Sequence, residues 1–125
     1  MNAEPDTKPT QPFPIFVVAG TAEGKTKLSA FDAALEEAGV ANFNLIHLSS
    51  VIPLHAVVKI GEPPGSSLPE KIGNRLYVVF ARQDEDRPGK RACAGLGWAL
   101  TANHLQWGLF VEHVGENETD VAQQI

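Results

Sequence analysis

The hydrophobic pattern of the chain first reads as a strand and then as a helix. The run FPIFVVAG (13–20) is apolar, partly β-branched and closed by glycine, which predicts a first strand that is fully buried. In LSAFDAALEEAGV (28–40) the apolar residues recur at helical spacing. Thr26 or Ser29 is suited to cap its start, and Gly39 stands where a left-handed C-terminal residue is wanted. This segment predicts an amphipathic helix.

Strand-like patterns dominate the rest of the chain, between turns rich in glycine, proline and charged residues. Five further runs predict strands: ANFNLIHL (41–48), VIPLHAVVKI (51–60), NRLYVVFAR (74–82), RACAGLGWALTA (91–102) and WGLFVEHVG (107–115). The last three are expected to form an antiparallel meander, and ENETDVAQQI (116–125) is expected to start a second helix. This order predicts an α+β domain, a mainly antiparallel β-sheet with helix packed on it.

Length and composition predict one domain with a real core. The chain has 125 residues, 43% of them hydrophobic; residues 1–13 read as a flexible proline-rich arm and residues 14–125 as a single domain. A net charge of -5 without a basic stripe predicts no nucleic-acid partner. No apolar run approaches the ~20 residues of a membrane helix, and no signal peptide is visible. With Cys93 as the single cysteine, we expect a cytoplasmic location.

The loop AGTAEGKT (19–26) has some features of a phosphate-binding loop. That motif needs a glycine five positions before its Gly-Lys-Thr, so that backbone N–H groups wrap the phosphates. Here Ala19 occupies that position, and Gly20 comes one residue too late. We therefore interpret the segment as a turn that leads into the helix, and a small nucleotide-binding domain is the least favoured alternative.

A serine pair, Ser49-Ser50, interrupts two extended apolar runs in NFNLIHLSSVIP (42–53). A serine hydroxyl in a constrained turn can attack the carbonyl of the preceding residue, and elimination from the resulting ester breaks the chain. The dehydroalanine that remains hydrolyses to an N-terminal pyruvoyl ketone. This chemistry needs a strained backbone, a donor for the oxyanion and a group that moves protons. The flanking strands would constrain the backbone, and Asn42 or Asn44 could donate.

The block LSAFDAALEEAGVANFNLIHLSSVIP (28–53) resembles the pyruvoyl-dependent arginine decarboxylases. In that family a T/S-A-F-D helix precedes an N-x-N-L strand, the self-cleaving serine pair and a proline. The segment GLFVEHVGE (108–116) is similar to the family's strand that bears an active-site glutamate. The resemblance implies an αββα-sandwich-like fold, with cleavage between Ser49 and Ser50.

Roles for single residues follow from the resemblance alone. Ser50 would become the covalent pyruvoyl group, so that no metal and no pyridoxal phosphate is needed. Asn44 would position the scissile carbonyl and later the cofactor. Glu112, expected to be partly buried, would move protons in processing and catalysis, and Asp32 would pair with the substrate's guanidinium. The ketone would form a Schiff base with the substrate's α-amine and take up the electrons released with CO₂.

The expected function is a pyruvoyl-dependent decarboxylase that converts arginine, a small cationic amino acid, to agmatine and CO₂. The resemblance implies a homotrimer or higher homo-oligomer with active sites between neighbouring subunits. A decarboxylase of another amino acid is one alternative, because the serine motif concerns processing more than substrate. A non-catalytic or truncated subunit of the same fold is another, because the chain ends soon after Glu112 and its C-terminal helical layer should be short.

Overall fold

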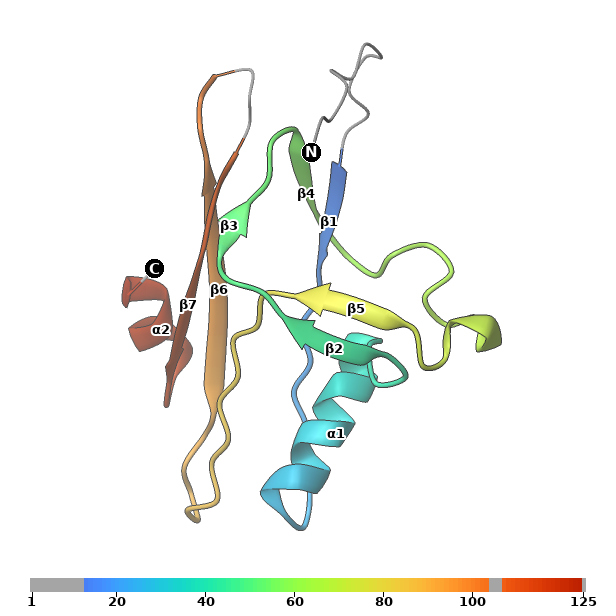
Figure 1. The fold of residues 1–125 in the computed structure, drawn as a ribbon. Helices are drawn as coiled ribbons and strands as arrows, with labels where there is room; N and C mark the ends of the chain where they lie inside the picture. Colours follow the sequence, from blue (N-terminus) through green and yellow to red (C-terminus); the bar gives the residue numbers. More distant parts are fainter. Residues whose placement is uncertain (1–12, 104–106, 125) are drawn as a thin grey trace.

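The computed structural model describes residues 13–103 and 107–124, and these form three small sheets and two α-helices (Figure 1). The strands are β1 (Phe13–Val17), β2 (Asn44–His47), β3 (Val51–Ile52), β4 (Ala56–Ile60), β5 (Arg75–Val78), β6 (Cys93–Leu100) and β7 (Gly108–Gly115). The helices are α1 (Lys27–Ala38), α2 (Glu118–Gln124) and the short 3₁₀ helix η1 (Pro69–Lys71). Most of the expected proline-rich arm lies outside the described residues, but Phe13 already belongs to β1.

Helix α1 confirms the clearest prediction from the sequence. At its start, Thr26 and Ser29 form a capping box: the Ser29 N–H donates to Thr26 Oγ1 at 3.0 Å, and the Thr26 N–H donates to Ser29 Oγ at 3.0 Å. At its end, Gly39 adopts the left-handed conformation with φ of 83° and donates its N–H to the Glu36 carbonyl. Local sequence alone therefore determines both ends of this helix.

Glycine at position 20 reflects close packing against α1. A Cβ atom there would overlap the carbonyl oxygen of Ala34 in the helix. The Thr26 hydroxyl, which a phosphate-binding loop would direct to a metal ion, is engaged in the capping box. The segment after β1 is thus a turn fitted to the helix, in line with our interpretation of the sequence.

Strand pairing differs from the predicted mainly antiparallel sheet. The α+β class is confirmed, but β1 pairs with β4 and β2 pairs with β5 in parallel, and the antiparallel sheet has the order β3-β7-β6. The predicted meander is confirmed for the antiparallel β6–β7 pair and wrong for β5, which pairs with β2 instead of β6. Alternation marks a segment as extended without naming its partner. The sheets are small, and the arrangement is not clearly an αββα sandwich.

The predicted single strand 51–60 is two strands, β3 and β4. Pro53 has no N–H to continue a ladder, and His55 adopts a left-handed conformation with φ of 61°. The His55 carbonyl accepts a hydrogen bond from the Phe13 N–H at 3.0 Å. The bend transfers the chain from the antiparallel sheet to the β1–β4 pair (Figure 1).

The core lies where β3, β4 and β7 meet. Ile52, Ala56 and Phe110 are buried there, and half-buried apolar residues pack around them: Ile15, Val17, Val58, Val79 and Leu96. The prediction of a fully buried β1 is wrong, because β1 has only β4 as its neighbour and its residues are exposed or half-buried. Helix α2 lies against β6 and β7, with Val121 buried. Neither described helix is long and apolar enough to cross a membrane.

Candidate active site

The serine pair lies where the chain passes from the β2–β5 pair to the antiparallel sheet (Figure 1). On the N-terminal side, the Leu48 N–H donates to the Val78 carbonyl at 2.8 Å. On the C-terminal side, the Phe110 N–H donates to the Ser50 carbonyl at 2.8 Å. The backbone is therefore tied to a different strand on each side of Ser49. This is the two-sided constraint that the sequence led us to expect around the Ser49–Ser50 bond.

Ser50 and Glu112 are in direct contact: Ser50 Oγ donates to Glu112 Oε1 at 2.9 Å. The register of β3 and β7 explains the contact. Val51 pairs with Leu109, so Ser50 faces Phe110, and Glu112 is two residues further on, on the same side of the strand. Antiparallel pairing thus brings together two residues that are far apart in the sequence.

A carboxylate at this distance is placed to take the hydroxyl proton, which makes the oxygen a better nucleophile. Ser50 is half-buried, but Glu112 is exposed in the single chain. The expectation that Glu112 is partly buried is therefore wrong for the isolated chain. Glu112 lies further along β7 than Phe110, outside the buried cluster to which Phe110 belongs. Its contact with Ser50 does not depend on burial.

Asn44 and Asp32 are placed differently from the Ser50–Glu112 pair. Asn44 is the first residue of β2, at the end away from Ser49, and its Nδ2 donates to the Gly73 carbonyl at 2.8 Å. Asp32 is exposed on α1. Within the described residues, no hydrogen bond or ion pair joins either side chain to Ser50 or Glu112. One chain thus brings Ser50 and Glu112 together without the other two predicted residues.

Phe110 contributes a backbone donor that sequence reasoning missed. Its N–H holds the carbonyl of Ser50, and its ring packs in the core and meets Trp98 edge-on at a centroid distance of 6.3 Å. Main-chain donors leave no mark in a sequence, because every residue except proline carries one. Only the position of Phe110 two residues before Glu112 could have indicated it.

Comparison with known proteins identifies the family. The family model described as "Pyruvoyl-dependent arginine decarboxylase (PvlArgDC)" matches residues 14–125. The chain belongs to this family. Curated proteins named pyruvoyl-dependent arginine decarboxylase include that of Thermococcus kodakarensis, 39% identical over 118 residues, which are 93% of this chain and 70% of the relative. The Pyrococcus abyssi protein is 40% identical over 116 residues, with the same coverage of 93% and 70%.

Another relative with this name, from Halobacterium salinarum, is 41% identical over 108 residues, which are 85% of this chain and 63% of the relative. The chain therefore spans 63–70% of the length of these three relatives. The resemblance carried by residues 28–53 is confirmed, and membership in the pyruvoyl-dependent arginine decarboxylases makes the chain a lyase of the decarboxylase type. The family's name implies a pyruvoyl group, and Ser50, with a carboxylate beside its hydroxyl and a donor on its carbonyl, fits the formation of that group.

Proposed function

We propose that this chain cuts itself between Ser49 and Ser50 and then decarboxylates arginine to agmatine and CO₂. The observation that carries the proposal is the 2.9 Å hydrogen bond between Ser50 Oγ and Glu112 Oε1. This hydrogen bond pairs Ser50, the proposed nucleophile, with Glu112, the proposed base, in a turn whose backbone is hydrogen-bonded to a strand on each side. The family match and the names of the relatives support the reaction and the substrate.

The cleavage proceeds in three steps. Glu112 takes the proton of the Ser50 hydroxyl, and Oγ attacks the Ser49 carbonyl carbon. The C–N bond then breaks and the proton passes to the nitrogen of residue 50, so that the peptide bond becomes an ester and the nitrogen becomes a free amine. Removal of the Cα proton of residue 50 expels the Ser49 carboxylate and leaves dehydroalanine. Water then replaces the nitrogen, ammonia leaves, and residue 50 becomes a pyruvoyl group.

Hydrogen bonds on both sides favour attack over relaxation. The Leu48 N–H and the Ser50 carbonyl are tied to Val78 and Phe110, so the Ser49 carbonyl cannot move away by rotating either neighbour freely. Holding two reacting groups in one geometry means that they no longer have to find each other by diffusion. In well-oriented systems this lowers the activation barrier by several kcal/mol. The backbone hydrogen bonds therefore supply this part of catalysis.

After cleavage, Phe110 and Glu112 would also serve the decarboxylation, although Oγ leaves with the Ser49 carboxylate. The pyruvoyl group supplies the carbonyl that binds the substrate amine and accepts the electrons released with CO₂. The Phe110 N–H continues to hold the carbonyl of residue 50, which keeps that residue beside β7. Glu112 then returns a proton to the substrate carbon, because it is the carboxyl group already next to residue 50.

Asn44 and Asp32 are assigned to a site shared with a second copy of the chain. Asn44 would position the scissile carbonyl and Asp32 would bind the guanidinium through paired hydrogen bonds. In a single chain neither side chain contacts Ser50. Large apolar side chains beside the serine pair are exposed: Leu48 at 53%, Val51 at 60% and Leu109 at 49%. Covering them with another copy would both bury apolar surface and complete the site.

A mixing experiment tests the shared site. Asp32→Ala copies would still be processed, and Ser50→Ala copies would still offer Asp32. If the site lies between copies, co-refolded mixtures of the two inactive variants regain activity, whereas a site within one chain leaves every mixture inactive. Size measurement of the wild-type protein in solution provides the control for assembly.

Product analysis tests the reaction and its substrate. The processed wild-type protein should release agmatine and CO₂ from arginine, and Ser50→Ala should release neither. Ornithine, lysine and histidine, offered at the same concentration, measure the contribution of the guanidinium. Release from one of these instead of arginine would show a decarboxylase of another amino acid. If the protein releases CO₂ from none of the four amino acids, the proposed enzymatic function is overturned in favour of a non-catalytic subunit.

A further inference from the structure

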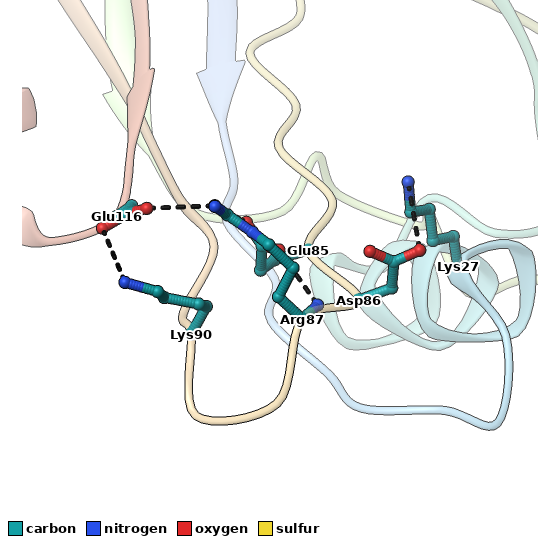
Figure 2. A network of polar contacts seen from close by, with 6 residues as sticks. All are labelled: Lys27, Glu85, Asp86, Arg87, Lys90 and Glu116. Atoms are coloured by element: carbon teal, nitrogen blue, oxygen red, sulfur yellow. Dashed lines mark hydrogen bonds and ion pairs between the residues drawn. The ribbon is translucent and has the colours of Figure 1, made fainter.

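The segment 80–90, called the strap here, connects α1 with the end of β7 (Figure 2). At its start, two side chains of the strap pack against one residue of α1. The guanidinium carbon of Arg82 lies 3.5 Å from the centroid of the Phe31 ring, and the Phe80 ring meets Phe31 edge-on at a centroid distance of 5.8 Å. Asp84 Oδ2 accepts from Arg82 Nε at 2.9 Å, which holds the guanidinium in place.

Two more contacts link the strap to the part of the chain that precedes the serine pair. Asp86 Oδ2 lies 3.5 Å from Lys27 Nζ, in the first turn of α1 (Figure 2). The Phe80 ring also lies 5.1 Å from the ring of His47 in β2. In both contacts the partner of the strap, Lys27 or His47, precedes Ser49 in the sequence. Self-cleavage would therefore turn each of these contacts into a contact between two fragments.

The other end of the strap is fastened to the C-terminal fragment. Arg87 Nη2 donates to Glu116 Oε1 at 3.0 Å, and Lys90 Nζ lies 3.9 Å from Glu116 Oε2 (Figure 2). Arg87 is further held by Glu85, with Nε to Oε1 and Nη2 to Oε2 both at 2.7 Å. Glu116 directly follows β7, the strand that carries Glu112. The strap thus spans from the strand with the proton-moving carboxylate to the helix with Asp32.

We infer that the strap positions α1, and through it the Asp32 carboxylate, for substrate binding once the chain is cut, and that Arg82 is the positioning residue. Phe31 directly precedes Asp32, so a side chain that fixes Phe31 also fixes the rotation of α1 about its axis. The inference rests on the proposed function, because it takes Asp32 as the partner of the guanidinium. It holds whichever copy's reaction centre Asp32 serves.

The kinetic test replaces Arg82 in the full, processed enzyme. Arg82→Ala should leave self-cleavage unchanged, because among the described residues no hydrogen bond or ion pair joins the strap to Ser50 or Glu112. It should raise KM for arginine about two- to fivefold, the change that an exposed cation–π contact is worth, with little change in kcat. Arg82→Lys keeps a cation over Phe31 and should restore most of the loss, and Arg91→Ala, an exposed arginine just beyond the strap, should match the wild type. The inference is overturned if kcat falls by the same factor as KM rises, or if Arg82→Lys does not restore KM.

A second readout does not depend on activity and separates the inference from the proposed function. In the uncleaved Ser50→Ala chain, adding Arg82→Ala should speed amide hydrogen exchange in α1 while exchange in β6 and β7 stays the same. Unchanged exchange in α1 overturns the strap even if the wild-type enzyme makes agmatine. Faster exchange in α1, found together with a wild-type chain that never cleaves, would keep the role of the strap in positioning α1 and overturn only the proposed function.

Discussion

The two sides of the serine pair are built differently. On the C-terminal side, β3 has only two residues, but Ile52 is fully buried and Ser50 is held by both Phe110 and Glu112. On the N-terminal side, β2 has four residues, none of which is buried, and its pairing with β5 forms an isolated two-stranded sheet. Strand length is therefore a poor guide to how well a segment is held here; burial and register place Ser50.

The two sides of the serine pair also carry different residues of the candidate site. The C-terminal side assembles the hydroxyl and the carboxylate within one chain. The N-terminal side carries Asn44 and Asp32, which remain apart from that pair. Cleavage would leave the two sides in different fragments, still joined by the β1–β4 and β2–β5 pairings. We expect the fragments to remain together under native conditions and to separate only in denaturant.

Removing the carboxylate on the C-terminal side should give the largest effect. Glu112→Gln keeps the size of the side chain but removes the base, so self-cleavage should slow by about 10²- to 10⁴-fold. The fraction of cut chain is followed over time on denaturing gels. Glu70→Gln, at an exposed carboxylate in η1, is the matched control and should cleave like the wild type. A Glu112→Gln chain that cleaves at the wild-type rate would remove the assigned role.

The contrast in burial predicts a contrast in stability. Ile52→Ala should lower the free energy of unfolding of the Ser50→Ala chain by about 2–5 kcal/mol, because it empties a fully buried site. Ile46→Ala in half-buried β2 should cost only ~1 kcal/mol, in proportion to the apolar area it buries. Urea denaturation measures both variants in the same uncleaved background. Equal costs would show that the two sides are equally rigid.

Acid should produce the smallest effect, confined to the strap. Hydrogen bonding to Arg87 lowers the pKa of the Glu85 carboxyl from its ordinary value of 4.5 to about 2. A lowered pKa in the folded state stabilises the fold above pH 4.5, and this stabilisation disappears as the pH falls through about 2. Because the Arg87 side chain is 59% exposed, solvent screening keeps the contribution small. Glu85→Gln should flatten this part of the stability curve, as measured by urea titrations from pH 5 to about 2.

Local features were predictable from the sequence and long-range ones were not. The capping residues Thr26 and Gly39 mark α1 because a helix end is encoded within a few residues. Which strand pairs with which depends on contacts between distant segments, so the parallel β2–β5 pair was missed. The bend at Pro53 and His55 was missed because an apolar run conceals it.

The site shows the same division. The serine pair was recognisable through its flanking motif, and Glu112 through the similarity of its strand to the family's. Their 2.9 Å contact depends on the register of β3 against β7, which no local pattern contains. The placement of Asn44 and Asp32 away from Ser50 within one chain likewise depends on long-range packing, which no local pattern contains.

Intact mass under denaturing conditions examines the Ser50 hydroxyl most directly. The wild-type chain should give two fragments that meet between Ser49 and Ser50, with a combined mass larger than that of the whole chain by one water minus one ammonia. Ser50→Ala should remain whole under the same incubation. A wild-type chain that stays in one piece, or fragments that together gain a full water as in simple hydrolysis, would contradict the formation of a pyruvoyl group from this serine.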